Sequence, residues 1–127
     1  MKKETINRAN KIIAIFMGLS YCEKYQYEGW YKNYEHNERI CDLNGLTYHR
    51  DWNKLMPVIE KIQTLGFSFH LFSDKYFYPE KGIRATLNFN SENVNFQCEG
   101  KSNIEACYKT VILFIEKHNE ANNIPNH

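Results

Sequence analysis

Apolar residues recur at spacings of three and four in three stretches of the chain, which is the pattern of an amphipathic helix. In the first stretch, Ile6, Ala9, Ile13, Phe16 and Met17 fall on one face. The other two stretches repeat the pattern, so each helix is expected to turn one apolar side toward a core. The three predicted helices cover residues 5–17, 51–65 and 102–119.

Residues at the ends of these stretches fit helix caps. Thr5, Asp51 and Ser102 are the expected N-caps, because their side chains accept hydrogen bonds from the free N–H groups of a first turn. Ser102 also opens a Ser-Asn-Ile-Glu sequence with the spacing of a capping box. Gly18 follows the first predicted helix, at the position where many helices end in a residue with a left-handed backbone conformation. Pro57 has no N–H to donate, so it is expected to make the start of the second helix irregular.

Between residues 67 and 99 the helical spacing gives way to alternation. Three runs, beginning at Phe67, Ile83 and Val94, alternate apolar with mostly polar residues. This alternation is typical of strands with one buried and one solvent-facing side. The sequence Asn90-Ser91-Glu92-Asn93 predicts a tight hairpin between the last two strands.

The stretch from residue 19 to residue 50 is the least regular part of the chain. Glu28–Tyr34 is predicted as a strand. Asn44-Gly45 is a turn signal, and Leu46–His49 is predicted as a short strand after it. This stretch adds irregular β structure between the first two helices.

Together these elements predict an α+β fold. We expect an antiparallel sheet of three to five strands packed by two or three helices, in the order α–β–α–βββ–α. The length of 127 residues fits a single domain over residues 1–127. The polar tail over about residues 120–127 is expected to fray.

The charge balance excludes two classes of function. The chain has 16 Lys and Arg against 15 Asp and Glu, a formal net charge of +1. A basic nucleic-acid clamp or an acidic mimic of nucleic acid needs a large excess of one sign. The apolar stretch Ile12–Leu19 ends without a cleavage site and is shorter than the ~20 residues of a membrane span. We therefore expect neither a secretory signal nor a membrane span in this stretch.

Candidate chemistry is sparse. None of the four cysteines forms a Cys-x-x-Cys pair, and the His and acidic residues lack metal-ligand spacing in the predicted helices. We therefore expect no enzyme activity, no cofactor and no metal. The alternative is a small enzyme that uses Cys22, Cys41 or His49.

Aromatic residues gather in two places. The first is the segment 21–34, where packing in the core and contact with a partner remain equal alternatives. The second lies just before Pro79. As partner contacts we assign Trp30, Tyr31 and Tyr34 in the first group and Lys75, Tyr76 and Tyr78 in the second.

Three blocks of sequence carry a family resemblance. They are Asn10–Gly18, Asp51–Ile62 and Asn103–Glu120, which cover the three predicted helices in order. On these blocks the chain resembles a widespread family of small proteins from phages and prophages of Bacteroidetes. The matching blocks are amphipathic helices, which indicate a fold and not a function. The resemblance therefore supplies no catalytic residues. It implies an accessory gene of a mobile element whose product acts in the bacterial cytoplasm.

Small proteins of that setting often bind host defence machinery. The resemblance therefore implies an anti-CRISPR protein that inhibits a type VI-B RNA-guided ribonuclease by stoichiometric binding. The expected partner is the effector ribonuclease or its guide-RNA complex, with RNA as a secondary contact. The alternative is a phage accessory protein that binds single-stranded RNA by stacking bases on the same aromatic residues.

Overall fold

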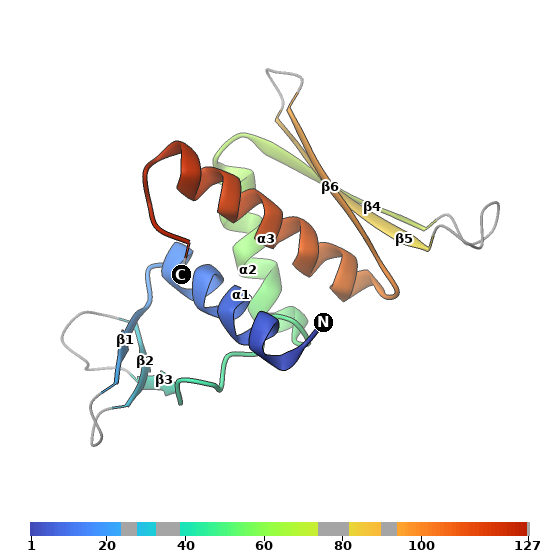
Figure 1. The fold of residues 1–127 in the computed structure, drawn as a ribbon. Coiled ribbons are helices and arrows are strands. Elements are labelled where there is room, and N and C mark those ends of the chain that lie inside the picture. The colour runs from blue at the N-terminus through green and yellow to red at the C-terminus, as the bar shows by residue number, and fades with distance from the viewer. Residues whose placement is uncertain (24–27, 33–38, 74–81, 90–93, 127) are drawn as a thin grey trace.

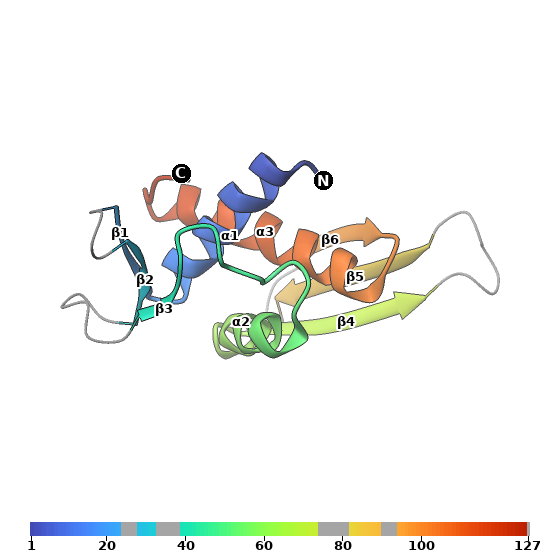
Figure 2. The same ribbon diagram turned by 90° about the horizontal axis from the view of Figure 1, so that it is seen from below.

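The computed structural model describes residues 1–23, 28–32, 39–73, 82–89 and 94–126. Over these residues the chain forms three helices and two three-stranded antiparallel sheets, which confirms the α+β class. The two sheets lie at opposite ends of the molecule with the helices between them (Figure 1). The view in Figure 2 shows the same separation. The early irregular strands thus form a sheet of their own.

The helices lie close to the predicted stretches. The caps Asp51 and Ser102 are confirmed: an Asp51 carboxylate oxygen accepts a hydrogen bond from the Asn53 N–H at 2.9 Å, and the Ser102 hydroxyl accepts one from the Glu105 N–H at 3.2 Å. The second helix continues through Pro57. The bounds are Lys3–Phe16 for α1, Trp52–Thr64 for α2 and Asn103–Ala121 for α3.

The predicted N-cap at Thr5 is wrong. The first helix begins two residues earlier, with Lys2 at the cap position and no side-chain hydrogen bond there. The Ile6 N–H already donates to the Lys2 carbonyl at 3.0 Å, so Thr5 lies inside the first turn. Gly18 ends this region as predicted, with a φ of 85°.

The larger sheet contains β4 (Phe67–Ser73), β5 (Ile83–Phe89) and β6 (Asn95–Gly100) in that spatial order, which confirms the three predicted strands. Helix α3 packs on β5 and β6, and α2 packs on β4. The Thr110 hydroxyl of α3 donates to the Ala85 carbonyl of β5 at 3.0 Å. Both helices therefore cover one side of this sheet.

The smaller sheet contains β1 (Ser20–Cys22), β2 (Gly29–Tyr31) and β3 (Arg39–Cys41). Its strands have three residues each. The predicted turn at Asn44-Gly45 is present, since the Gly45 N–H donates to the Asp42 carbonyl at 2.9 Å.

The predicted strand at Leu46–His49 is wrong. The Arg50 and Asp51 N–H groups both donate to the Thr47 carbonyl, at 3.1 and 3.0 Å. These bonds close a turn that leads directly into α2, so the backbone there cannot stay extended. The apolar residues of this stretch therefore pack against the rest of the protein from a loop and not from a strand.

The main core lies where the three helices meet the larger sheet. Its fully buried members come from all of these elements and include Ile13, Leu55, Ile59, Leu87 and Ile115. Helix α1 packs against α3, where the rings of Phe16 and Phe114 meet edge to face with centroids 6.2 Å apart.

The tail beyond α3 folds back on the helix as far as residue 126. The Ile124 N–H donates to the Asn119 carbonyl at 2.8 Å. The side chain of Asn126 accepts a hydrogen bond from Asn119 at 2.9 Å and donates one to the Glu116 carbonyl at 3.3 Å. Hydrogen bonds therefore hold a segment that the sequence predicts to fray.

Candidate functional site

Two of the predicted partner contacts lie in the interior. Trp30 is 2 % exposed and Tyr31 is 3 % exposed. The Trp30 indole N–H donates to the Leu43 carbonyl at 3.1 Å, and its ring belongs to the main core. For these two residues the structure favours packing over partner contact. Four other predicted contacts lie outside the described residues: Tyr34, Lys75, Tyr76 and Tyr78.

The side of the larger sheet turned away from the helices is the first candidate surface, which we call the outer face. The strand register places its residues in three rows across β4, β5 and β6. Five of its nine side chains are exposed, and eight are polar or charged. The rows are Ser68–Asn88–Asn95, His70–Thr86–Gln97 and Phe72–Arg84–Glu99.

Phe72 is the exception among these polar residues. Its side chain is 45 % exposed at one end of the outer face. The His70 ring stacks on it with centroids 6.1 Å apart and planes 23° apart. The Arg84 guanidinium carbon lies 5.5 Å from the centre of the Phe72 ring, which is a cation–π distance. The three side chains form a preorganised platform that a partner can cover.

A buried hydroxyl lies in the middle row. Thr86 belongs to the central strand, and its side-chain oxygen has no hydrogen-bond partner in the described part of the chain. A buried hydroxyl without a partner costs stability, by about 1–3 kcal/mol. The outer face thus combines an exposed aromatic platform with an unsatisfied polar group.

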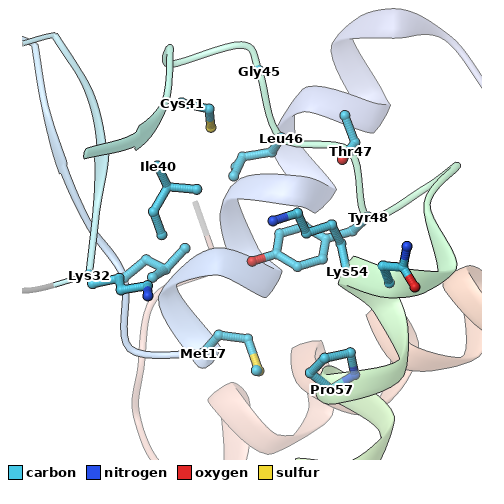
Figure 3. Close-up of a pocket in the computed structure, with 12 residues that line it drawn as sticks. Met17, Lys32, Ile40, Cys41, Gly45, Leu46, Thr47, Tyr48, Lys54 and Pro57 are labelled. Atoms are coloured by element: carbon cyan, nitrogen blue, oxygen red, sulfur yellow. The ribbon is translucent and has the colours of Figure 1, made fainter. Parts of the chain in front are cut away.

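A pocket of about 600 Å³ is the second candidate site (Figure 3). It opens between the end of α1, strand β3, the loop before α2 and the first turns of α2. Lys32 and Lys54 lie on its walls, and no Asp or Glu is among the described residues that line it. Tyr48 reaches into it from the loop, with its hydroxyl toward the interior of the pocket (Figure 3).

Two titratable groups of this pocket, the Cys41 thiol and the Tyr48 hydroxyl, have raised pKa values. Burial raises the pKa of the Cys41 thiol, and the nearby Asp42 carboxylate adds to the shift. Burial, together with Cys41, raises the pKa of Tyr48 to about 12. Because the thiolate is the nucleophilic form of cysteine, a raised pKa makes the Cys41 thiol less reactive than an ordinary cysteine.

His49, the histidine named for the enzyme alternative, takes part in a structural network. Its Nδ1 atom lies 3.1 Å from the side-chain nitrogen of Asn10, which also donates to the Leu46 carbonyl at 3.0 Å. The Tyr108 hydroxyl donates to the Asn10 side-chain oxygen at 2.8 Å. Burial lowers the pKa of His49, with Arg50 as a lesser cause. The network joins α1, the loop before α2 and α3.

The side chains that could ligate a metal ion lie apart from one another in the described ranges. No group of three or more His, Cys, Asp or Glu side chains gathers there closely enough to hold an ion. In the same ranges no helix has the length and apolar character needed to cross a bilayer.

The sequence reasoning missed both candidate sites. The alternation in 67–99 predicts a solvent-facing side, and Phe72 at a position of that side was a readable signal for an exposed aromatic residue. No comparable signal marked the pocket, because Lys32, Tyr48 and Lys54 come from separate elements.

Comparison with known proteins identifies no relative of this chain. Neither protein-family models, nor curated proteins, nor solved structures include a match to this chain. The resemblance to phage and prophage proteins therefore stays a prediction from the three sequence blocks.

Proposed function

We propose that this protein works by binding a protein partner, and that the outer face of β4–β6 is its contact surface. The exposed platform of Phe72, His70 and Arg84 supports this most directly. Aromatic and arginine side chains supply much of the energy at protein interfaces. A rigid platform also loses little entropy on binding, since its rings are already stacked.

The charges on this face favour a protein over RNA. Its described residues carry one cation, Arg84, and one anion, Glu99, at paired positions of β5 and β6. An RNA site needs several cations to neutralise phosphates. Asn and Gln side chains fill much of the remaining face, and they hydrogen-bond a protein surface equally well as donors or acceptors.

The size of the face indicates how far the contact extends. Strands of six or seven residues give an area of roughly 300 Å² from ordinary strand spacings. A specific complex buries about 800 Å² on each partner. The contact must therefore reach neighbouring surface. Lys75, Tyr76 and Tyr78 follow β4 in the sequence and remain predicted contacts, although they lie outside the described residues.

For the identity of the partner, the sequence resemblance is the only support. It favours an anti-defence role in the bacterial cytoplasm, with inhibition of a type VI-B RNA-guided ribonuclease by stoichiometric binding. This form of the proposal needs no catalytic residue. It is consistent with the raised pKa of the Cys41 thiol and with the hydrogen-bond network that contains His49.

Co-expression with a type VI-B effector and its guide RNA tests the partner. We expect the protein to co-purify with the effector and to suppress RNA cleavage at equimolar amounts. Undiminished cleavage at molar excess, without co-purification, would eliminate this effector as the partner. A gel shift with short single-stranded RNA at low salt tests the RNA alternative, for which we expect no binding at micromolar protein.

Two variants test the surface. Phe72→Ala removes the exposed ring and is expected to weaken the complex by about tenfold or more. Tyr21→Ala removes another exposed aromatic side chain, which lies in β1 of the other sheet, and is expected to leave binding unchanged. Equal losses in the two variants would contradict the assignment of the outer face.

A further inference from the structure

Strand β4 lies at one edge of the larger sheet. Within the described ranges β5 is the only strand that pairs with it, and β4 runs along the lower margin of this sheet in Figure 2. The open edge of such a strand offers backbone N–H and C=O groups to a further strand. We propose that β4 pairs antiparallel with β4 of a second copy of this chain, which joins the two larger sheets into one.

The sequence of β4 lacks the features that keep most edge strands from pairing. Natural edges carry charged residues, prolines or bulges. The strand Phe67–Ser73 contains no Asp, Glu, Lys, Arg or Pro, and its register with β5 runs without a shift over all seven residues. The opposite edge strand, β6, has polar residues at its exposed positions: Asn95, Gln97 and Glu99. The observations therefore favour β4 as the edge that pairs.

Both sides of β4 expose apolar surface near the end of the strand. Leu71, on the side of the helices, is 39 % exposed, and Phe72, on the outer face, is 45 % exposed. Antiparallel pairing centred on Leu71 places this residue opposite Leu71 of the second copy, and His70 opposite Phe72 of the second copy. Aromatic and apolar side chains at opposite positions stabilise paired strands. The strand is thus complementary to itself, as a two-fold symmetric dimer requires.

Helix α2 offers apolar cover for the added strand. It is the helix that packs on β4. Trp52 and Met56 lie about one turn apart on it and are 38 % and 37 % exposed. A strand placed beside β4 would lie next to α2, where these side chains would remove its apolar residues from water, which is favourable.

The length of the pairing sets the expected strength of the dimer. Residues 69–73 of each chain would pair, and they span about 17 Å at the usual rise of a strand. A contact of this size belongs to the weak class of protein association, in which less than about 1,200 Å² is buried in total. We therefore expect a dissociation constant of about 10–100 μM.

Sedimentation equilibrium of the full chain between about 5 and 500 μM tests the proposal. The wild type is expected to show a reversible equilibrium between monomer and dimer. Leu71→Lys removes the apolar contact and places two ammonium groups opposite each other, so it should weaken the dimer at least about tenfold. Val94→Lys is the matched control: Val94 is also 39 % exposed but precedes β6, and its variant should stay within about twofold of the wild type. A wild type that stays monomeric throughout, or equal losses in the two variants, would overturn the proposal.

Hydrogen exchange of the wild type at low and high concentration locates the contact. We expect amide exchange in residues 69–73 to slow as the concentration rises, while exchange in β6 stays unchanged. Slower exchange in β6 in place of β4 would contradict the assigned edge. Circular dichroism checks that both variants are folded. These measurements use this chain alone, so their outcome is independent of the partner proposed above.

Discussion

The network around Asn10 gives the sharpest test of how the helices are held together. Asn10 is almost fully buried in α1, and its amide group uses both N–H donors and its oxygen. The Tyr108 hydroxyl of α3 donates to that oxygen at 2.8 Å. We predict that Tyr108→Phe, which removes only the hydroxyl, destabilises the protein measurably.

The expected magnitude follows from the burial of both partners. Without the Tyr108 hydroxyl, the Asn10 oxygen is left in the core without its donor. An unsatisfied buried acceptor costs about 1–3 kcal/mol. At this chain length 1 kcal/mol lowers the melting temperature by about 4 °C, so a loss of about 4–12 °C is expected.

Urea unfolding followed by far-ultraviolet circular dichroism measures this loss. The midpoint should fall while the slope of the transition stays constant, because the surface exposed on unfolding hardly changes. Tyr21→Phe is the matched control, since Tyr21 is exposed in β1, and its change is expected to stay within about 0.5 kcal/mol.

A double-mutant cycle then identifies the bond itself. Asn10→Ala and Tyr108→Phe share one interaction, so the double variant should cost less than the sum of the single variants, by about 1 kcal/mol. Strict additivity, or a loss below about 0.5 kcal/mol for Tyr108→Phe, would refute the reasoning.

Three further predictions concern His49, Trp30 and Thr86. The pKa of His49 is lowered in the folded state, so the unfolded state binds more protons at mildly acidic pH. The free energy of unfolding in urea should therefore fall as the pH drops below about 6.5. His49→Gln should weaken this pH dependence. Trp30→Ala should lower the free energy of unfolding by about 3–5 kcal/mol in a urea titration, whereas a surface residue would cost little. Thr86→Val should leave the melting temperature unchanged or raise it slightly, because it removes an unpaired buried hydroxyl. A clear drop would show that the hydroxyl is paired.

Periodicity predicted the elements with strong local signals. The helical spacing located all three helices, and alternation located β4, β5 and β6. The caps at Asp51 and Ser102 were readable because capping depends on a few adjacent residues. The misplaced start of α1 shows the limit of this reasoning: the cap at Lys2 has no side-chain hydrogen bond for a sequence pattern to signal.

The aromatic segment could not be resolved in the same way. Trp30 and Tyr31 are adjacent in β2, and both are buried, although neighbouring residues of a strand point to opposite sides. Their burial depends on distant parts of the chain, such as the Leu43 carbonyl that accepts the indole N–H. Such tertiary contacts have no local signature, so core and interface were equal alternatives in the sequence.

The two candidate sites have no local signature for the same reason. The platform needs the register that brings Phe72 of β4 beside Arg84 of β5. The pocket needs Lys32, Tyr48 and Lys54 to converge from separate elements. Composition indicated only that the net charge of +1 disfavours a nucleic-acid clamp, and the balanced charges of the outer face agree with that inference.

The most direct test of the central claim is the affinity of the Phe72→Ala variant for the purified, guide-loaded type VI-B effector, measured by calorimetry beside the wild type and Tyr21→Ala. The account predicts one-to-one binding by the wild type and by Tyr21→Ala, with an affinity at least about tenfold weaker for Phe72→Ala. Equal affinities for all three proteins, or no binding by any of them, would contradict it.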